Sequence, residues 1–417
     1  MKHEVLKRII FDQHEVIRNS EIMKRDYTFE KQANYVLVGL RRAGKSTLLY
    51  SIVRDLIDSG VSWERIIYVN FEDERLSEFK IEDFNDILTV QAELSDEKGF
   101  FFFDEIQNVP GWEKFARRIA DAKERVYITG SNAKMLSREI GTTLGGRFLT
   151  KYISPYSFTE YLCAKQVGTS TVSTRDEGRV RGEFSAYFRN GGLPETLLFQ
   201  NKRDYLSSVC QKILLGDIVA RNGLRNDTGI KILIKKIAES VRSEISYSKL
   251  HNALKAIGVS LSKDAVIDYI SFIKDSYLVF DIQNYYLKFS ERESTPKYYF
   301  SDNGILNLFL LDKDTALLEN LVAVTLKERY EEVFYLKSPK TGVDVDFYIP
   351  QEKTAVQVAY SVSGEARERE ISSLVRLSEA SDSPEKYIII TYEEEETVSV
   401  GSISIRIIPI YKFLLNQ

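Results

Sequence analysis

The chain has 417 residues, a formal net charge of −4, and a composition of 43% apolar and 28% charged residues. This length exceeds what one hydrophobic core usually supports, so we expect about two to four domains. The net charge excludes a protein that is basic over its whole surface. Two cysteines are too few for a disulfide framework, and no charge-free apolar stretch approaches the ~18 residues of a membrane span. We therefore expect a cytoplasmic protein that does not enter a membrane.

The first motif lies between a short apolar run at 34–39 and a segment at 46–56 whose apolar residues recur with helical spacing. The intervening GLRRAGKS fits the phosphate-binding pattern GxxxxGKS in a strand, loop and helix context. Its glycines let the backbone amides wrap around phosphates. We expect Lys45 to contact the β and γ phosphates of ATP and the Ser46 hydroxyl to ligate Mg²⁺. The predicted nucleotide-binding residues are Gly39, Leu40, Arg41, Arg42, Ala43, Gly44, Lys45, Ser46 and Thr47.

A second apolar run, GFFFF at 99–103, ends at Asp104 and Glu105. A buried parallel strand delivers such side chains to the C-terminal edge of its sheet, where ligands bind. We predict that Asp104 holds the Mg²⁺ shell and that Glu105 orients and polarises the attacking water. Two solvated acids at a strand end are the simpler interpretation, but their position downstream of the loop favours the catalytic one.

A third strand at 125–129 leads into GSN, where Asn132 is a candidate sensor of the γ phosphate or a helix cap. Downstream, LGGR places Arg147 after a glycine-rich turn. Its guanidinium is a candidate for stabilising the charge of phosphoryl transfer, in cis or across a subunit boundary. Arg41 and Arg42 are further candidates for this role.

These motifs together resemble a known family, the prokaryotic AAA-type ATPases with an AAA_14 domain and a C-terminal DUF4143 region. The resemblance rests on VGLRRAGKSTLLY, FFFFDEIQNVPGWEKFARR, YITGSNAKMLSREIGTTLGGR with YISPYSFTEYL, and NGGLPE, and it spans nearly the whole chain. It implies an α/β P-loop NTPase fold of the AAA class with a parallel sheet. It also implies that Asp104 and Glu105 form the Walker B pair. Ser131 or Asn132 would then be the sensor, and Arg147 an arginine finger.

From residue 228 onward, GIKILIKKIAESV, YSKLHNALKAIG and SKDAVIDYISFIKD predict amphipathic helices, with Ser248 and Ser262 as N-caps of the second and third. The β-rich YLVFDIQNYYLKF that follows predicts a hairpin. Three helices and a hairpin make a winged-helix arrangement, in which Lys255 and Lys263 would face DNA. A helical packing or partner-binding module is the alternative.

The segment 221–263 carries nine Lys or Arg against three Asp or Glu, which is +6 in a chain of negative net charge. Such a cluster attracts phosphate backbones, or else forms a solvated helical face. Before it, 165–183 is rich in Ser, Thr, Gly and charge, and predicts an exposed connection.

The C-terminal part predicts a helix near 318–330, strands at 333–337, 343–350 and 354–361, a helix at 365–377, and strands at 386–392 and 404–410. This order resembles the restriction-endonuclease core, in which a helix glutamate, a strand aspartate and a following ExK hold Mg²⁺ and activate water. Glu319 and Asp346 match the first two positions, but QVA at 357–359 stands where the acid and the lysine belong. We therefore expect a restriction-endonuclease-like α/β fold without nuclease activity, unless Lys353 or another residue takes the missing role.

The expected domains are an ATPase domain at 1–160, a helical connection or lid at 161–225, a winged-helix-like domain at 226–310 and a nuclease-like domain at 311–417. We expect an ATPase that uses ATP and Mg²⁺ and couples its nucleotide state to a DNA-binding tail through 221–263, with a homo-oligomer as an option. The alternatives are a nucleotide-gated switch that grips a protein partner, and an active Mg²⁺-dependent DNA nuclease.

Overall fold

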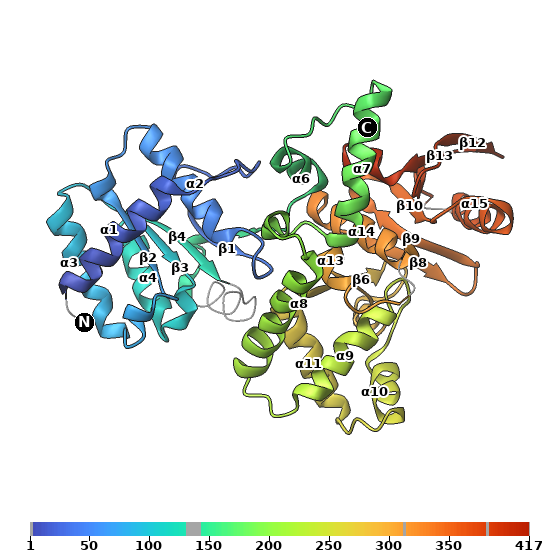
Figure 1. Cartoon of the computed structure of the whole chain (residues 1–417). Coiled ribbons are helices and arrows are strands. Elements are labelled where there is room, and N and C mark those ends of the chain that lie inside the picture. Colours follow the sequence, from blue (N-terminus) through green and yellow to red (C-terminus); the bar gives the residue numbers. More distant parts are fainter. Residues whose placement is uncertain (1–2, 131–142, 312–313, 381–382, 417) are drawn as a thin grey trace. The chain divides into compact units, whose positions relative to one another are not determined.

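The computed structural model describes residues 3–130, 143–311, 314–380 and 383–416. Its contacts divide the chain into two compact units. Unit 1 comprises Met1–Ile153 with Asp275–Tyr277, and unit 2 comprises Ser154–Lys274 with Leu278–Gln417. Figure 1 shows the helices and strands of each unit.

Unit 1 is built on a five-stranded parallel sheet with the strand order β2-β3-β4-β1-β5, which confirms the predicted parallel sheet. The strands β1 to β4 are short apolar runs buried on both faces, as in a parallel sheet that helices cover on both sides. Because the strands run in one direction, their C-terminal ends meet at one edge of the sheet. The strands are β1 Asn34–Val38, β2 Ile66–Asn70, β3 Phe100–Asp104, β4 Arg125–Gly130 and β5 Phe148–Tyr152.

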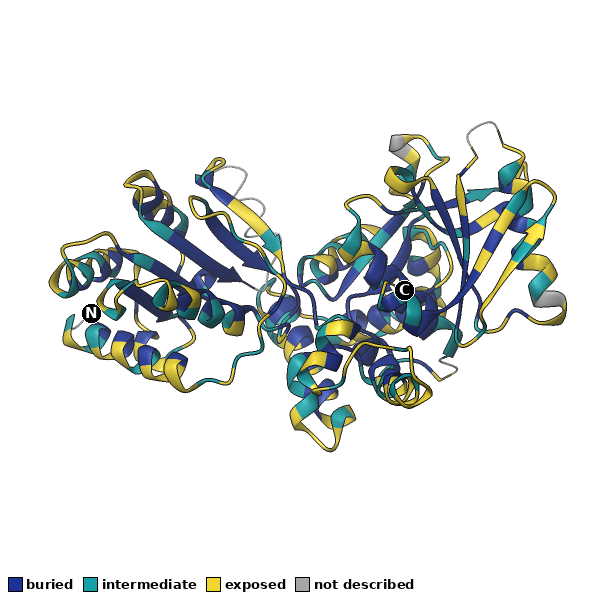
Figure 2. Cartoon of the chain, turned by 90° about the horizontal axis from the view of Figure 1, so that it is seen from above, coloured by how far each residue is buried: buried dark blue, intermediate teal, exposed yellow. Residues whose placement is uncertain are grey.

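Helices cover both faces of this sheet, and the strands β1 to β4 are buried, whereas β5 is largely exposed (Figure 2). Val36 and Val38 pack with residues of α1, α3 and α4 on one face, whereas Tyr35 and Leu37 pack with residues of α2 on the other. This alternation follows from the two-residue period of a strand. The helices are α1 His3–Asn19, α2 Lys45–Asp58, α3 Phe84–Leu94 and α4 Trp112–Asp121, with 3-10 turns at Trp63–Arg65, Glu74–Leu76, Ile81–Asp83 and Ile106–Asn108.

Unit 2 begins with helices. The exposed connection predicted at 165–183 is shorter in the structure, because α7 already begins at Thr174 with Ser173 as its N-cap. The helices are α6 Phe158–Ala164, α7 Thr174–Asn190, α8 Lys202–Lys212, a π-helix Ile213–Ala220, α9 Asp227–Glu239, α10 Tyr247–Ala256, α11 Lys263–Asp275, α12 Phe289–Arg292, α13 Asn303–Leu306, α14 Asp314–Arg329, α15 Gly364–Ser378 and α16 Ile410–Leu414, with 3-10 turns at Pro194–Leu198 and Pro350–Glu352. In the described ranges of both units, no helix has the length and apolar character needed to cross a membrane.

The three amphipathic segments after residue 226 form α9, α10 and α11. The predicted cap Ser262 is confirmed, since its Oγ accepts a hydrogen bond from Ala265 N–H at 3.1 Å. The predicted cap Ser248 is wrong, because it lies inside the first turn of α10. Ser246 caps this helix instead, with extended backbone and an Oγ that accepts from Lys249 N–H at 3.2 Å.

A mixed eight-stranded sheet forms the other part of unit 2, in the order β12-β13-β11-β10-β9-β8-β6-β7. The strands β8, β9 and β10 are antiparallel neighbours, whereas β10, β11 and β13 are parallel. Leu374 and Leu377 of α15 form a core with residues of this sheet, such as Val345 and Ile389. The strands are β6 Val279–Asn284, β7 Lys297–Phe300, β8 Phe334–Ser338, β9 Val343–Ile349, β10 Thr354–Val358, β11 Lys386–Thr391, β12 Glu396–Val400 and β13 Ile403–Pro409.

The hairpin predicted within 277–289 is only partly right: its first strand forms β6, but the antiparallel partner is β7, which lies beyond that segment, with Val279 opposite Phe300. It is not a separate wing, because β6 also pairs in parallel with β8, where Gln283 lies opposite Phe334. The hairpin therefore extends the eight-stranded sheet, and residue 310 does not separate two sheets.

The carboxylate of Asp302 holds the NGGLPE segment in place. Gly192 N–H donates to Asp302 Oδ2 at 2.8 Å, and Ile305 N–H donates to Oδ1 at 3.0 Å, which caps α13. A Cβ on Gly191, where φ is 72°, would lie 2.2 Å from Asp302 Oδ1, so only glycine allows this approach. Burial raises the pKa of Asp302 to about 6, although the backbone donors lower it.

Candidate functional site

The loop between β1 and α2 lies at the C-terminal edge of the unit 1 sheet. Its backbone enters the positive-φ region at Gly39 (φ 145°), Arg42 (φ 65°) and Gly44 (φ 93°). Alternation of this kind turns backbone N–H groups toward a common centre, and such concavities bind anions. Gly44 is the N-cap of α2, so the positive end of a helix dipole lies at the same place. The local structure is that of an anion-binding loop.

The first glycine of the loop is fixed by close packing. A Cβ on Gly39 would lie 2.2 Å from the carbonyl oxygen of Ile153. Ile153 is itself held there, since its N–H donates to Val38 O at 2.7 Å. The residue that follows β5 therefore packs directly against the start of the loop and leaves room only for glycine at position 39.

Lys45 is buried inside the loop, with 5% of its surface exposed. Its Nζ donates to the carbonyl oxygens of Gly39 and Leu40, at 3.0 Å each. These acceptors offset the cost of burying an ammonium group. The loop thus contains both the backbone donors and a positive charge that a polyphosphate requires.

Ser46 follows in the first turn of α2 and reaches the acidic pair. Its hydroxyl is a polar neighbour of the carboxylate of Asp104 and lowers the pKa of that group. Thr47, the next residue, is exposed. A hydroxyl and a carboxylate side by side are the kind of oxygen ligands that Mg²⁺ takes.

Asp104 ends β3 and has 2% of its surface exposed. Tyr68 OH donates to Asp104 Oδ2 at 3.0 Å, and Thr129 Oγ1 donates to Oδ1. Burial and the charge of Glu105 raise the pKa of Asp104, whereas its hydroxyl donors lower it. A carboxylate that is poorly hydrated but held in place by hydroxyl groups favours a cation beside it.

Glu105 adopts the left-handed conformation, with φ 51° and ψ 41°. Such backbone is uncommon for a residue with a Cβ and clusters at functional sites. Glu105 N–H donates to Thr129 Oγ1 at 3.0 Å, and Gln107 Nε2 donates to Glu105 Oε2. Thr129 thus holds the backbone of Glu105 and Gln107 holds its carboxylate, and the residue is less buried than Asp104.

Three arginines contact the loop or extend from it. Arg25 has 7% of its surface exposed, and its Nη1 donates to Ala43 O at 3.0 Å. Arg41 Nη1 lies 3.5 Å from Glu72 Oε1, whereas Arg42 is exposed. Arg25, which belongs to no recognised motif, therefore supports the loop from the N-terminal segment.

The third strand predicted to end in polar residues is β4, which lies between β1 and β3 in the sheet. The strand ends at Gly130. Ser131 and Asn132 lie outside the described residues, so the sensor role of Asn132 stays a prediction.

Arg147 lies at the opposite edge of the sheet from the loop. Phe148, at the start of β5, is opposite Asn34 at the start of β1, and Asn34 Nδ2 donates to Arg147 O at 3.3 Å. The five residues of β1, at ~3.3 Å each, place the loop roughly 16 Å further along the strand. Arg147 Nε donates to Asp121 Oδ1 at the end of α4. The structure does not bring Arg147 to the loop of its own chain, and we do not retain its predicted role in cis.

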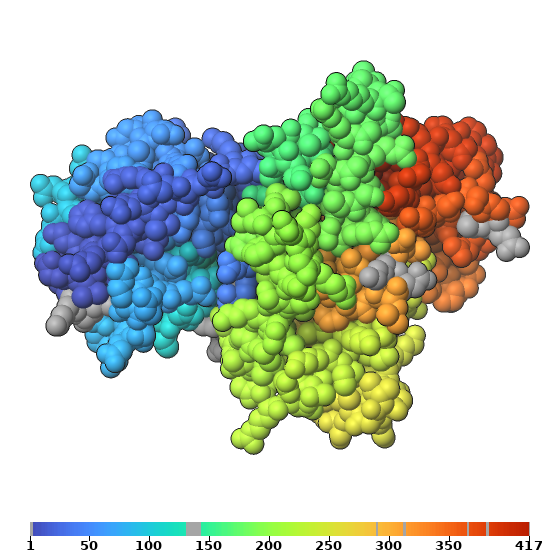
Figure 3. Space-filling model, viewed as in Figure 1, coloured from blue at the N-terminus to red at the C-terminus, as the bar shows by residue number. Residues whose placement is uncertain are grey.

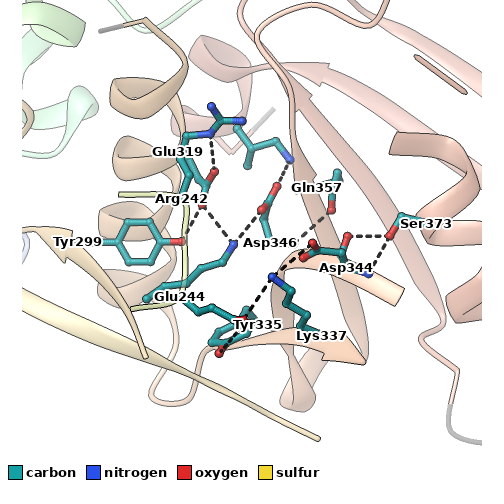
Figure 4. A network of polar contacts seen from close by, with 12 residues as sticks. Arg242, Glu244, Tyr299, Glu319, Tyr335, Lys337, Asp344, Asp346, Gln357 and Ser373 are labelled. Atoms are coloured by element: carbon teal, nitrogen blue, oxygen red, sulfur yellow. Dashed lines mark hydrogen bonds and ion pairs between the residues drawn. The ribbon is translucent and has the colours of Figure 1, made fainter. Parts of the chain in front are cut away.

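In unit 2, the structure brings Glu319 of α14 and Asp346 of β9 together around a lysine that sequence patterns did not identify. Lys297 Nζ, from β7, lies 3.4 Å from Glu319 Oε1 and 3.0 Å from Asp346 Oδ1. Gln357 belongs to the same cluster, because its Oε1 accepts from Asp346 N–H at 3.2 Å (Figure 4). Lys353 Nζ instead pairs at 2.7 Å with an acid that directly precedes β11. Lys353 therefore does not replace the missing nuclease lysine.

The basic segment 221–263 lies on the surface of unit 2, in yellow-green in Figure 3. Lys255 and Lys263 are exposed, at the end of α10 and the start of α11. Lys231 and Lys236 form ion pairs along α9, at 2.9 and 2.7 Å. Part of the positive charge counted from the sequence is therefore already balanced by neighbouring acids.

Tyr68, Thr129 and Lys297 were not identified from the sequence. Thr129 offered a weak signal, since it is the polar residue that ends the apolar part of a strand just before GSN. Lys297 offered another, because it begins the aromatic run KYYF, and a lysine in a buried strand is rarely unpaired. Tyr68 lies among apolar residues and offers no signal.

Two family models match the chain. AAA_14, described as an AAA domain, matches residues 31–162, and DUF8612, a domain of unknown function, matches residues 181–316. The first confirms the AAA-type, nucleotide-binding character of the N-terminal part. The second corrects the expectation of a DUF4143 region.

Two curated proteins are similar to most or all of the chain. The uncharacterized protein MJ1544 of Methanocaldococcus jannaschii is 31% identical over 433 residues, which cover 100% of this chain and 96% of the relative. An uncharacterized protein of Haemophilus influenzae is 31% identical over 340 residues, which cover 78% of this chain and 82% of the relative.

Among solved structures, the Walker-type ATPase PABY2304 of Pyrococcus abyssi aligns with a TM-score of 0.42 and 14% identity, covering 74% of this chain and 95% of that one. The Orc1 protein of Aeropyrum pernix, solved in complex with DNA, aligns with a TM-score of 0.28 and 14% identity, covering 77% of this chain and 94% of that one. These scores describe a limited likeness.

Proposed function

This chain belongs to one family with these archaeal and bacterial relatives, and because its unit 1 contains an AAA domain, we propose that it hydrolyses ATP to ADP and phosphate with Mg²⁺. One observation carries the proposal: the loop that buries Lys45 between β1 and α2 and the acidic pair at the end of β3 meet at the C-terminal edge of the same parallel sheet. Close packing of the sheet does not by itself require a buried lysine and a buried aspartate at this edge.

The residues at this edge fit a nucleotide with a metal ion. Gly39 tolerates no side chain against Ile153, and its positive φ starts the turn of the anion-binding loop. The oxygen atoms of Ser46 and Asp104 form a donor set that suits Mg²⁺. The site therefore offers hydrogen-bond donors for phosphate and oxygen ligands for the metal ion at neighbouring positions.

The roles of the chain's own groups follow from this placement. The loop amides and Lys45 would hold the phosphates, while Ser46 and Asp104 would hold Mg²⁺, which neutralises charge on the β and γ phosphates. Glu105 would orient the attacking water and polarise it by accepting a hydrogen bond. Thr129 would act as a positioning residue, because it contacts both Asp104 and the backbone of Glu105.

The proposal is tested by replacing Glu105 with glutamine. We expect Glu105→Gln to retain ATP binding and to lose turnover by about a hundredfold or more, the usual contribution of a general base. Glu74→Gln, which changes an exposed glutamate of unit 1, is the matched control and should keep the parental rate. Turnover of Glu105→Gln at the parental rate would contradict the catalytic assignment.

For unit 2, we propose a DNA-binding tail composed of a helical connection at 161–225, the helices α9 to α11, and an inactive nuclease-like part whose sheet includes β6 and β7. The three helices α9 to α11 and the exposed Lys255 and Lys263 support it. The double variant Lys255→Gln/Lys263→Gln should weaken duplex binding at low salt and reduce the salt slope by about two. Lys24→Gln/Lys31→Gln, with the same change of charge in unit 1, should leave both unchanged.

A further inference from the structure

A cavity of about 400 Å³ lies within unit 2 beside the cluster around Lys297. Its walls come from the segment after α9, from β7, β8, β9 and β10, and from one face of α14 and of α15. On α15, Arg369, Ser373 and Arg376 follow one another at helical spacing, so they share the face that lines the cavity. The cavity is lined by more charged and polar side chains than the ion pairs of Lys297 alone would need.

The ammonium group of Lys297 occupies the space between the two acids that match the nuclease pattern. Lys297 has 3% of its surface exposed, and its Nζ contacts both Glu319 and Asp346. Although burial lowers it, the charges of these two acids raise the pKa of Lys297 above its ordinary value. A positive charge is therefore permanently present where a nuclease of this pattern would place its metal ion.

Further donors from the protein also engage the oxygen atoms of the two acids. Tyr299 OH donates to Glu319 Oε1 at 2.8 Å, and Arg242 Nε donates to Glu319 Oε2 at 3.3 Å. Val358 N–H donates to Asp346 Oδ2 at 3.0 Å. A divalent cation would have to displace these donors as well as the lysine, at a large cost in a buried site.

Gln357 does not supply the missing metal ligand. Its Oε1 accepts from Asp346 N–H, and its Nε2 donates to Glu370 Oε2 at 2.5 Å. Arg369 Nε donates in turn to Glu370 Oε1 at 3.0 Å. Gln357 therefore links β9 to α15, and both ends of its amide are occupied.

Two guanidinium groups of the lining retain open donors. Arg242 adopts a left-handed backbone with φ 84°, and its side chain is 44% exposed. In the described parts of the chain, its bond to Glu319 uses Nε, which leaves Nη1 and Nη2 for a ligand. Arg376 is exposed and uses Nη1 for a bond to Gly342 O at 2.8 Å. Guanidinium forks of this kind are suited to phosphate oxygens.

The charge of the described lining is positive on balance, with five Lys or Arg against four Asp or Glu. Burial and the charge of Asp346 raise the pKa of Glu319, so one of the four acids tends toward its neutral form. Lys337, at the same cavity, is shared between Glu244 and Asp344 at 3.5 and 3.8 Å. The cavity thus favours an anion over a cation.

We propose that this cavity binds a phosphate group without a divalent metal ion, with Arg242 and Arg376 as the donors to the phosphate and Lys297 as the fixed positive charge in place of the metal. The phosphate can belong to a nucleic acid or to a free nucleotide, since both present the same chemistry. The proposal deepens the DNA-binding part of the proposed function by naming its site in unit 2. It does not depend on ATP turnover in unit 1.

The experiment measures binding in EDTA with full-length protein that carries Lys45→Ala, so that the loop of unit 1 does not contribute. The probes are a duplex with a 5′ phosphate, the same duplex without it, and ADP. We expect Arg242→Gln/Arg376→Gln to weaken binding of at least one phosphate probe about tenfold or more. The control variant Lys255→Gln/Lys263→Gln removes the same charge from the exposed basic segment. It should leave the binding of ADP largely unchanged. It should weaken the binding of a duplex less than Arg242→Gln/Arg376→Gln does.

Several outcomes decide the proposal. It is overturned if the two-arginine variant binds every probe as the parent does, if EDTA abolishes binding that Mg²⁺ restores, or if the parent cleaves the duplex with Mn²⁺. Lys297→Met should reduce the same binding without creating a need for metal, provided that its circular dichroism matches the parent. If that variant does not fold, the two-arginine variant decides alone. The ATP turnover of Glu105→Gln is measured with Lys45 intact and without DNA. Failure of the proposed ATPase activity and failure of the proposed phosphate site are therefore seen in separate experiments.

Discussion

Thr129 donates its hydroxyl hydrogen to Asp104 Oδ1, and so joins the middle strand β4 to the acid at the end of β3. The same oxygen accepts from the backbone N–H of Glu105 at 3.0 Å. One hydroxyl therefore positions both acids of the candidate site. This relationship leads to a prediction about the pH dependence of turnover.

Replacing Thr129 with valine keeps its shape and removes the hydroxyl. Because that donor lowers the pKa of Asp104, its loss should raise this pKa further, and the acid limb of the ATPase pH profile should move to higher pH. We also expect kcat to fall about tenfold, since a hydrogen bond to a charged group is lost. Thr129→Ser should restore both properties. A valine variant with the parental pH profile would contradict the positioning role.

Gly39→Ala tests the close approach between the loop and the segment after β5. The new Cβ would lie 2.2 Å from Ile153 O at a φ of 145°, so we expect loss of nucleotide binding and unit 1 destabilised by about 2 kcal/mol or more. Gly60→Ala is the matched control, because Gly60 also has positive φ (98°) but nothing lies within 4 Å of the added carbon. Gly60→Ala should cost only about 1 kcal/mol and retain binding. Equal effects of the two changes would show that backbone strain, not packing, sets the requirement for glycine.

The elements of unit 1 could be predicted from the sequence because they depend on local patterns. The apolar runs at 34–38 and 100–103 are long enough for strands, and the glycine, lysine and serine spacing of the loop has one structural meaning. The position of Arg147 does not depend on such a pattern. It follows from the register of β5 against β1, a contact between residues that are far apart in the sequence.

Unit 2 shows the same division between local and long-range information. The helices α9 to α11 follow from their periodicity, but the choice of Ser246 over Ser248 as a cap depends on which of two nearby serines has extended backbone. The pairing of β6 with β8 and the insertion of Lys297 between Glu319 and Asp346 join three or more distant segments. No spacing in the sequence records either one.

Arg147→Ala distinguishes the structural role of this residue from a role across subunits. Its pairing with Asp121, on the edge of the sheet opposite the loop, predicts that kcat for ATP stays within about twofold of the parent. Asp121→Ala should behave in the same way, because it removes the same exposed ion pair. A loss of about a thousandfold in Arg147→Ala alone, appearing only at protein concentrations where the chain assembles, would indicate an arginine finger in trans.

Asp302 makes the stability of unit 2 depend on pH. Burial raises its pKa from 3.8 to about 6 in the folded chain, so the folded state binds more protons than the unfolded state between these values. The free energy of unfolding of unit 2 should therefore fall as the pH rises through this window, by up to about 3 kcal/mol. Asp302→Asn should remove this contribution to the slope, whatever its effect on stability at a single pH.

The measurement can assign this effect to unit 2. Trp63 and Trp112, the two tryptophans of the chain, both lie in unit 1, so their fluorescence follows the unfolding of that unit. Circular dichroism follows both units. Asp302→Asn should change the pH dependence of the dichroism transition and leave the fluorescence transition as it is in the parent. Asp268→Asn, at an exposed position of α11, should change neither, and a parental slope in Asp302→Asn would mean that Asp302 stays ionised throughout this range.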